Sequence, residues 1–358
     1  MRLKTPFEAS FGTIHQRSVL LVEVAADGVT GWGEVTTTEE PFYNSETVET
    51  AWLMISKFLV PRIVGQRVSG GNDIPRLFAA IRGHEMARAG IETAVWDLEA
   101  KQKGQPLWKL LGGQSRELPC GVSLGIHSCP ESLVETTDRE LAAGYQRIKL
   151  KIKPGKDLTY VEAVRRRYPD ILLSVDANSA YTDSDTAHLR PLDGFNLLMI
   201  EQPLWWDDIY QHARLQQVIR TPICLDESIR HLRDTIAAIE LQACRILNIK
   251  LGRVGGHSSA KDIQTYCGEK KIPVWCGGMF ESGIGRAHNI AMSTLPSFTL
   301  PGDVSASQRY WEEDIIEPEV TVTLQGTITP SLSPGIGHVV RHDLIELLTL
   351  EQESWRAD

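Results

Sequence analysis

Five charged residues recur at a nearly constant interval in the middle of the chain. Lys151, Asp176, Glu201, Asp226 and Lys250 are separated by 25, 25, 25 and 24 residues, and each ends a short apolar segment. A strand, a loop, a crossover helix and a second loop use roughly this length in a parallel βαβ unit. The spacing therefore predicts successive parallel strands with a charged side chain at each carboxyl end. In a β/α barrel these ends share the face where catalytic groups lie.

The three carboxylates in this series predict a cation site. Acids that converge unpaired in a barrel mouth repel one another, and a hard divalent cation removes the repulsion. Oxygen-only ligands favour Mg²⁺, with Mn²⁺ as the substitute, over zinc or copper. We therefore expect Asp176, Glu201 and Asp226 to be metal ligands. Each acid alone also fits a helix N-cap or a solvated loop, but the shared spacing and the flanking lysines favour the metal site.

The two lysines that flank the carboxylates suit proton transfer. Lysine has a reference pKa of ~10.4, but a neighbouring cation makes its neutral amine accessible. We expect Lys151 and Lys250 on opposite sides of the carboxylates, where they reach either face of one carbon atom. Lys149 precedes Lys151 by two residues on the same predicted strand, so it points to the same side. We expect Lys149 to stabilise a developing anion.

These residues together resemble the site of the enolase superfamily, muconate-lactonizing subgroup. The shared features are the K-x-K pair at 149–151, the Asp/Glu/Asp triad and the strand of Lys250. Longer segments resemble more narrowly the o-succinylbenzoate synthase/N-succinylamino acid racemase family: GVSLGI at 121–126, NIKLGRVGGH at 248–257, PVWCGGMFESGIGRAHN at 273–289 and FTLPGDVSASQRYW at 298–311. The resemblance covers essentially the whole chain. It implies metal-dependent removal of a proton α to a carboxylate, through an ene-diolate intermediate.

Two reactions fit this resemblance, and the sequence leaves both open. One is dehydration to o-succinylbenzoate in menaquinone biosynthesis, with Lys151 as the base and Lys250 protonated throughout. The other is racemisation of N-succinylamino acids or other N-acylamino acids, with the two lysines as acid and base. The alternatives are a muconate-type cycloisomerase or another epimerase of the superfamily, and a barrel that binds metal without turnover.

The resemblance also implies residues around the substrate. Residues 7–11 and 36–46 correspond to loops that cap the barrel mouth, although their aromatic residues fit packing within the small domain equally well. The candidate substrate contacts are Phe7, Phe11, Phe42, Tyr43, Ser123, Gly278, Met279 and Arg253, of which the last is expected to tune Lys250. Asn178, Glu227 and Asp303 are expected to support the ligands from behind. Ser305 replaces a second acid that dipeptide epimerases carry, which argues against that substrate class.

The order of predicted elements indicates an α/β fold, a modified TIM barrel of the (β/α)7β type. Helix-length segments separate strand-like runs near 120–126, 147–152, 171–176, 197–202, 222–226, 245–250, 273–277 and 298–303. We place the barrel at 118–325, an α+β capping domain at 1–117 and a returning C-terminal segment at 326–358. In the capping domain, Asp27-Gly28 predicts a hairpin turn, and helices are expected over 45–59 and 84–103. Its first strand, usual in this family, is expected to be absent.

Composition and charge narrow the class of protein further. The length of 358 residues suits one barrel of ~250 residues with a smaller domain. The net charge of −9 argues against nucleic acid or an anionic membrane as a partner. No apolar run approaches the ~20 residues that span a bilayer, and no signal peptide is apparent. Six scattered cysteines without a C-x-x-C pair are typical of a cytoplasmic protein. We expect a cytoplasmic homo-oligomer that acts on a small-molecule carboxylate.

Overall fold

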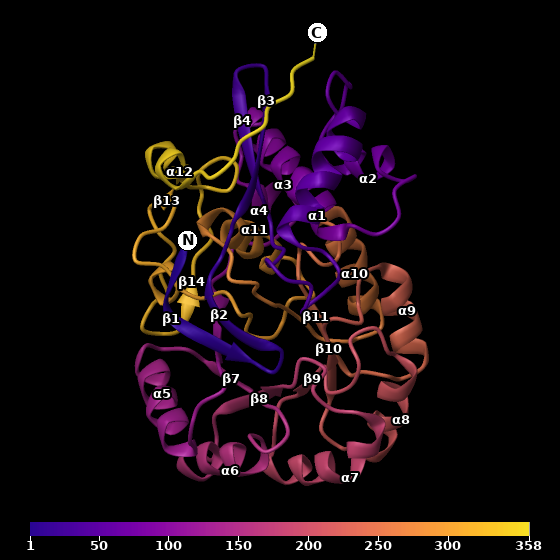
Figure 1. Cartoon of the computed structure of the whole chain (residues 1–358), viewed down its shortest axis with the longest axis vertical. Coiled ribbons are helices and arrows are strands. Elements are labelled where there is room, and N and C mark those ends of the chain that lie inside the picture. The colour runs from indigo at the N-terminus through magenta and orange to yellow at the C-terminus, as the bar shows by residue number, and fades with distance from the viewer. Residues whose placement is uncertain (358) are drawn as a thin grey trace.

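The N-terminal elements and the barrel helices occupy opposite ends of the molecule. In the computed structural model, which describes residues 1–357, β3, β4 and α3 lie at one end and α5, α6, α7 and α8 at the other (Figure 1). The N-terminal elements are β1 (Arg2–Ala9), β2 (Gly12–Gln16), β3 (Leu20–Ala26), β4 (Val29–Val35), α1 (Val48–Met54), α2 (Ile74–Leu77), α3 (Glu85–Gln102) and α4 (Leu107–Leu110).

Local sequence signals explain how the N-terminal elements begin and pack. Asp27 and Gly28 both adopt positive φ, at 52° and 76°, and form the predicted turn between β3 and β4. Thr47 begins α1 with a capping box, and a π-helical turn, Ile55–Leu59, continues the helix. Gly33 lets α3 lie directly on β4, because a Cβ atom there would sit 2.1 Å from the carbonyl oxygen of Gly90. The predicted hairpin and both predicted helices are confirmed.

Seven parallel strands form the barrel sheet, and each pairs with the next in chain order. They are β6 (Gly121–Leu124), β7 (Arg147–Lys151), β8 (Leu172–Asp176), β9 (Ile200–Glu201), β10 (Ile223–Leu225), β11 (Ile246–Ile249) and β12 (Val274–Cys276). The helices that follow them are α5 (Pro130–Ala142), α6 (Leu158–Arg167), α7 (Thr186–Leu189), α8 (Tyr210–Val218), α9 (Leu232–Glu240), α10 (His257–Glu269) and α11 (Gly283–Ser293). Short 3-10 turns lie at Val60–Arg62, Gly71–Asp73, Asp183–Asp185, Arg190–Phe195 and Ser307–Arg309. The predicted alternation of strands and helices is confirmed.

The segment 298–303 closes the barrel but is not the regular eighth strand that we predicted. Isolated parallel bridges join Phe298 to Val274 on one side and Gly302 to Cys120 on the other. Pro301 interrupts the ladder between the bridges, because proline has no N–H to donate. Only the position of the strand was therefore predicted correctly.

The C-terminal segment runs back from the barrel to the N-terminal elements. It contains β14 (Thr327–Ile328), β15 (Val339–Val340) and α12 (His342–Leu348); β14 pairs with β5 (Leu118–Pro119), and β15 pairs with β13 (Ile316–Glu317), which precedes the segment. The backbone N–H of Ile336 donates to Asp97 on α3 at 2.7 Å. The predicted domain limits at 117 and 325 stay predictions. Within residues 1–357, no helix has the length and apolar character needed to cross a membrane.

Candidate active site

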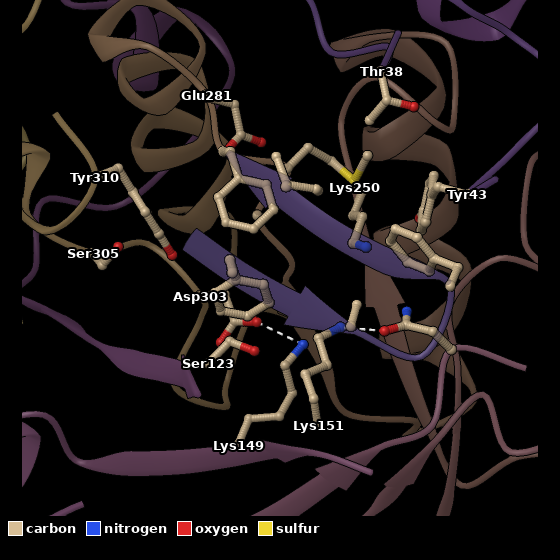
Figure 2. Close-up of a pocket in the computed structure, with 18 of the residues that line it drawn as sticks. Thr38, Tyr43, Ser123, Lys149, Lys151, Lys250, Glu281, Asp303, Ser305 and Tyr310 are labelled. Carbon is tan, nitrogen blue, oxygen red and sulfur yellow. Dashed lines mark hydrogen bonds and ion pairs between the residues drawn. The ribbon is translucent and has the colours of Figure 1, made fainter. Parts of the chain in front are cut away.

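A cavity of about 750 Å³, including the part open to solvent, lies at the carboxyl ends of the barrel strands. Lys149, Lys151 and Lys250 line it, together with residues of the β1–β2 hairpin and of the segment after β12. Figure 2 shows Lys250 entering from one side and Lys149 and Lys151 from the other. The structure therefore brings all three predicted lysines into one cavity.

Lys151 and Asp176 end the neighbouring strands β7 and β8 in register with each other. Nζ of Lys151 donates to Oδ2 of Asp176 at 2.6 Å and also to Oδ1 of Asn178. The backbone N–H of Asn178 donates to the other oxygen of Asp176 at 3.0 Å. The side-chain amide of Asn178 also donates to the buried Glu227 at 2.8 Å. Asn178 thus fixes both members of the ion pair and joins them to Glu227.

Lys149 lies deeper than Lys151, is only 2% exposed and contacts three carboxylates. Its Nζ lies 2.8 Å from Oε2 of Glu201 and 3.1 Å from Oδ2 of Asp176. Oδ2 of Asp303 approaches the same nitrogen to 2.7 Å. The ring of Trp275 covers another side, with its centroid 4.8 Å from Nζ. One ammonium group therefore links the ends of β8 and β9 to the segment that closes the barrel.

Lys250 and Asp226 form the corresponding pair on the opposite side. Nζ of Lys250 lies 2.8 Å from Oδ2 of Asp226 and 4.3 Å from the ring centroid of Tyr43. The hydroxyl of Tyr43 donates to Oδ1 of Asp226 at 3.1 Å. The guanidinium group of Arg253 donates to this same Oδ1. The ammonium group of Lys250 therefore contacts both the carboxylate of Asp226 and the aromatic ring of Tyr43.

Arg253 does not line the cavity, contrary to our expectation of a substrate contact. It is 2% exposed, and its guanidinium also donates to the carbonyl oxygens of Ile229, at 2.6 Å, and Asn248, at 2.5 Å. The structure places it on Oδ1 of Asp226, while Lys250 contacts Oδ2 of the same carboxylate. Any influence of Arg253 on a substrate therefore passes through that carboxylate.

Burial and neighbouring charges act differently on the three lysines. Burial lowers the pKa of Lys151; attraction by Asp176 opposes this, and repulsion by Lys149 adds to it. Burial also disfavours the charged form of Lys250, but Tyr43 and the nearby carboxylates outweigh it and raise the pKa of Lys250. The carboxylates around Lys149 likewise outweigh its burial and raise its pKa. Among the three amines, the neutral form is most accessible at Lys151.

The three predicted metal ligands are fully buried at the ends of β8 and β9 and just beyond β10. Their oxygens contact the three lysines. Among the described residues, no three His, Cys, Asp or Glu side chains converge closely enough to hold a metal ion in this arrangement. The donor set nevertheless suits a hard cation, because it offers only carboxylate oxygens. Burial and the charge of Asp176 raise the pKa of Glu201. A cation between these two predicted ligands would remove this repulsion.

Most of the predicted substrate contacts line the cavity. They are Phe7, Phe11, Tyr43, Ser123, Gly278 and Met279. Phe42, in contrast, is 60% exposed and does not line it. Oγ of Ser123 is buried and has no hydrogen-bond partner within the described residues. A buried hydroxyl of this kind calls for a partner, and a polar group of a substrate would supply one.

The hairpin of β1 and β2 crosses the cavity mouth as the indigo strands in Figure 2. We predicted a loop over 7–11, but Phe7 belongs to β1 and only Ser10 and Phe11 form the turn. Oγ of Ser10 donates to the carbonyl oxygen of Asn178 at 3.0 Å, and Glu8 pairs with Lys153 at 2.9 Å. These contacts join the hairpin to the loops that follow β7 and β8, and Phe7 and Phe11 line the cavity from it.

Two buried polar residues of the site were missed in the sequence. Asn248 donates to Oε1 of Glu201 at 2.6 Å, and Arg147 pairs with Asp303. Each stands two residues before one of the predicted lysines, so strand alternation directs it to the same face. That alternation was the signal that could have found them. The cavity wall also includes residues that we did not predict: Ala9, Ile14, Thr38, Phe280, Glu281, Arg286, Ser305 and Tyr310.

Two family models match the chain. Residues 1–112 match the N-terminal domain of mandelate racemase/muconate lactonizing enzyme, and residues 132–344 match the enolase C-terminal domain-like family. The second match alone covers more than half of the 358 residues.

Curated relatives and a solved structure match over nearly the whole length. An o-succinylbenzoate synthase from Geobacillus kaustophilus is 51% identical over 350 residues, which are 98% of this chain and 93% of the relative. An N-succinylamino acid racemase from Thermus thermophilus is 43% identical over 350 residues, covering 98% and 95% of the two chains. A member of the enolase superfamily from Listeria innocua superposes with a TM-score of 0.93 at 40% identity, covering 97% of this chain and 94% of that one.

Proposed function

The chain belongs to the enolase superfamily, and on that premise we propose that it removes a proton α to a substrate carboxylate, as an o-succinylbenzoate synthase, an N-succinylamino acid racemase or both. The resemblance that the sequence motifs suggested is thereby confirmed at the level of the family. One observation supports the proposed chemistry above others. The ammonium groups of Lys151 and Lys250 enter one cavity from opposite sides, each on its own buried carboxylate (Figure 2).

The proposal includes a divalent cation, which the family implies. We propose Mg²⁺, with Mn²⁺ as a substitute, held by Asp176, Glu201 and Asp226. The support is that all three acids are fully buried, offer oxygen only and stand at or just beyond the ends of three neighbouring strands. When bound, the cation would supply a Lewis acid for the substrate carboxylate.

The lysines perform the proton transfer in this proposal. Neutral Lys151 takes the α proton on one face of the substrate carbon, and in racemisation protonated Lys250 delivers a proton to the other face. In dehydration, Lys151 also assists the loss of hydroxide while Lys250 remains protonated. The buried ammonium of Lys149 stabilises the negative charge that develops on the substrate. Its three carboxylate contacts keep it in place before the substrate arrives.

The cavity wall supports a substrate with an apolar part and a second polar group. Phe7, Phe11 and Met279 supply the apolar surface, and the unpartnered hydroxyl of Ser123 is available to a succinyl oxygen or an amide. Arg253 is proposed to act on Lys250 through Asp226. Muconate-type cycloisomerisation stays the alternative within the superfamily, and side-by-side kcat/KM values for the three substrate classes separate the possibilities.

The test compares both reactions in the wild type and in two variants. We expect turnover of the succinylbenzoate precursor, of N-succinylamino acids or of both. Lys151→Ala and Lys250→Ala should each lower racemisation by at least ~10²–10⁴-fold, the range that a general acid or base contributes. Lys156→Ala is the matched control, because its ammonium group bonds the carbonyl of His127 and does not line the cavity.

Two results would contradict the proposal. Substantial racemisation by either lysine variant would refute the two-base assignment. If the wild type binds metal but exchanges no substrate α-proton in D₂O, the barrel is a binding module and not the proposed enzyme.

The setting of the reaction is also a proposal. All six cysteines are free, and five of them are buried, which supports a reducing compartment such as the cytoplasm. We propose a homo-oligomer that acts on a small-molecule carboxylate, with no nucleic acid or membrane partner. Light scattering on the purified protein gives the oligomeric state directly.

A further inference from the structure

Arg147 is a fully buried cation that does not line the cavity. It precedes Lys149 by two residues on β7, so both side chains project to the same face. The guanidinium carbon lies 4.6 Å from the ring centroid of Trp275, the same ring that covers Lys149. On the neighbouring strand β6, a Cβ atom at Gly121 would lie 2.5 Å from Nε of Arg147. The glycine therefore leaves the space that the guanidinium group occupies.

One carboxylate connects this guanidinium to the lysine above it. Oδ1 of Asp303 accepts from Nη2 of Arg147, and Oδ2 lies 2.7 Å from Nζ of Lys149. The dashed line from Lys149 to Asp303 in Figure 2 marks the second contact. The same Nζ contacts Glu201 at 2.8 Å and Asp176 at 3.1 Å. Positive and negative groups therefore alternate from Arg147 to the proposed metal ligands.

This alternation divides the attraction of Asp303 between two cations. If the guanidinium were removed, Lys149 would be the charged partner left to a nearly buried carboxylate. A buried charge that loses one partner binds the remaining one more strongly. The ammonium group would then stay on Asp303, from which it lies 2.7 Å, and lose its contact with Glu201.

We propose that Arg147 is a positioning residue, which acts through Asp303 to hold the ammonium of Lys149 beside Glu201 and Asp176. The inference rests on the proposed function, because it assumes that Lys149 stabilises the anion formed from the substrate. Arg147 lies outside the cavity, so its loss should reduce kcat and leave KM nearly unchanged. A supporting partner of this kind contributes roughly 10- to 100-fold.

The experiment compares Arg147→Met, which keeps the volume and removes the charge, with Arg147→Lys, which keeps the charge. We expect kcat of Arg147→Met to fall by about 10- to 100-fold with KM within about threefold of wild type. Arg147→Lys should recover most of kcat. The guanidinium group of Arg147 donates to only one oxygen of Asp303, Oδ1, and the ammonium group of a lysine can make a single contact of this kind. Arg116→Met is the matched control: its guanidinium bonds the carbonyls of Ser293 and Phe298 away from the cavity, so it should lower stability without changing kcat.

A crystal structure of Arg147→Met gives a readout that does not depend on turnover. In it, Nζ of Lys149 should stay on Asp303 and lose its contact with Glu201. If the contact with Glu201 persists, or if folded Arg147→Met keeps kcat within about twofold of wild type, the inference is overturned. If Arg147→Met does not fold, Asp303→Asn is tested instead, because it removes the charge that connects Arg147 to Lys149. An unchanged kcat of Asp303→Asn also overturns the inference. A wild type without turnover would instead reject the proposed function.

Discussion

Asp97 on α3 ties three separate parts of the chain together, and its replacement should destabilise the protein strongly. Its carboxylate is fully buried and accepts from the backbone N–H of Trp32 at 2.9 Å and of Ile336 at 2.7 Å. The ammonium of Lys101 donates to it at 2.7 Å. One side chain thus fastens β4 and the returning C-terminal segment to the same helix.

The size of the effect follows from the groups that Asp97→Ala leaves behind. The N–H groups of Trp32 and Ile336 would lose their acceptor in a buried place, and each such loss costs about 1–3 kcal/mol. Lys101 is 23% exposed and can turn to water, so it adds little. The expected loss is therefore about 2–6 kcal/mol, which is a large fraction of the 5–15 kcal/mol typical of folded proteins. Asp97→Asn keeps one acceptor oxygen and should lose about half as much.

Urea unfolding of wild type, Asp97→Ala and Asp97→Asn measures these differences through the transition midpoints. Asp343→Ala is the matched control: its carboxylate lies on the surface of α12, paired with Arg341, and its loss should leave the midpoint unchanged. Below the transition, kcat should equal that of wild type, because Asp97 does not line the cavity. A loss below about 1 kcal/mol for Asp97→Ala would show that these hydrogen bonds do not hold the C-terminal segment.

Two further predictions concern metal and pH. Treatment with EDTA should abolish turnover, and Mg²⁺ or Mn²⁺ should restore it; undiminished activity in excess chelator would contradict the proposed ligands. Hydrogen bonds with Asp234 and Glu85 raise the pKa of His231 to about 9. The folded state therefore binds this proton more tightly than the unfolded state, so the added stability is complete below pH 6.5 and is lost as pH rises through 9. His231→Gln should flatten Tm between pH 6.5 and 9; an unchanged slope would show that another group causes it.

The strand ends of the site were predictable because they depend on a short repeating unit. A βαβ unit has a nearly fixed length, so the interval between Lys151 and Lys250 located the strands and the face that they share. The structure brings Lys149, Lys151 and Lys250 into one cavity on that basis. Local periodicity also located the two helices of the N-terminal part, at 45–59 and 84–103, whereas the barrel helices followed from the helix-length segments between the strands. These features need no knowledge of contacts between distant residues.

The hairpin at the cavity mouth was predicted wrongly because its sequence has local loop signals. Pro6 and Ser10 favour turns, yet residues 2–9 form β1. Proline is tolerated there because β1 pairs with β2 alone, and the register shifts between Arg2 and Phe7, where Pro6 lies. Only the tertiary placement of the hairpin across the barrel decides between strand and loop. No short segment of the sequence specifies where the hairpin packs.

The partners of the charged groups could not be predicted for a related reason. Arg253 bonds Asp226, 27 residues away, and Arg147 bonds Asp303, 156 residues away. Strand alternation indicates which face each side chain occupies, but the choice of partner depends on the height of each group within the barrel. Pro301 interrupts the ladder just before Asp303, so a regular strand pattern does not give the position of Asp303. The sequence therefore indicated which charged residues belong to the site and which face of the sheet they occupy, but it did not indicate which of them pair with each other.

The pairing also explains how so many charges can be buried at one site. The inner face of β7 carries Arg147, Lys149 and Lys151 at successive inward positions, and these like charges would repel one another if they were alone. Asp303 separates the first two, and Asp176 contacts the second and the third. Each cation is therefore held by a carboxylate from another part of the barrel, so its position is fixed before any ligand binds. A preorganised ammonium group stabilises a developing anion without having to move, and the same interlocking means that the loss of one member displaces the next.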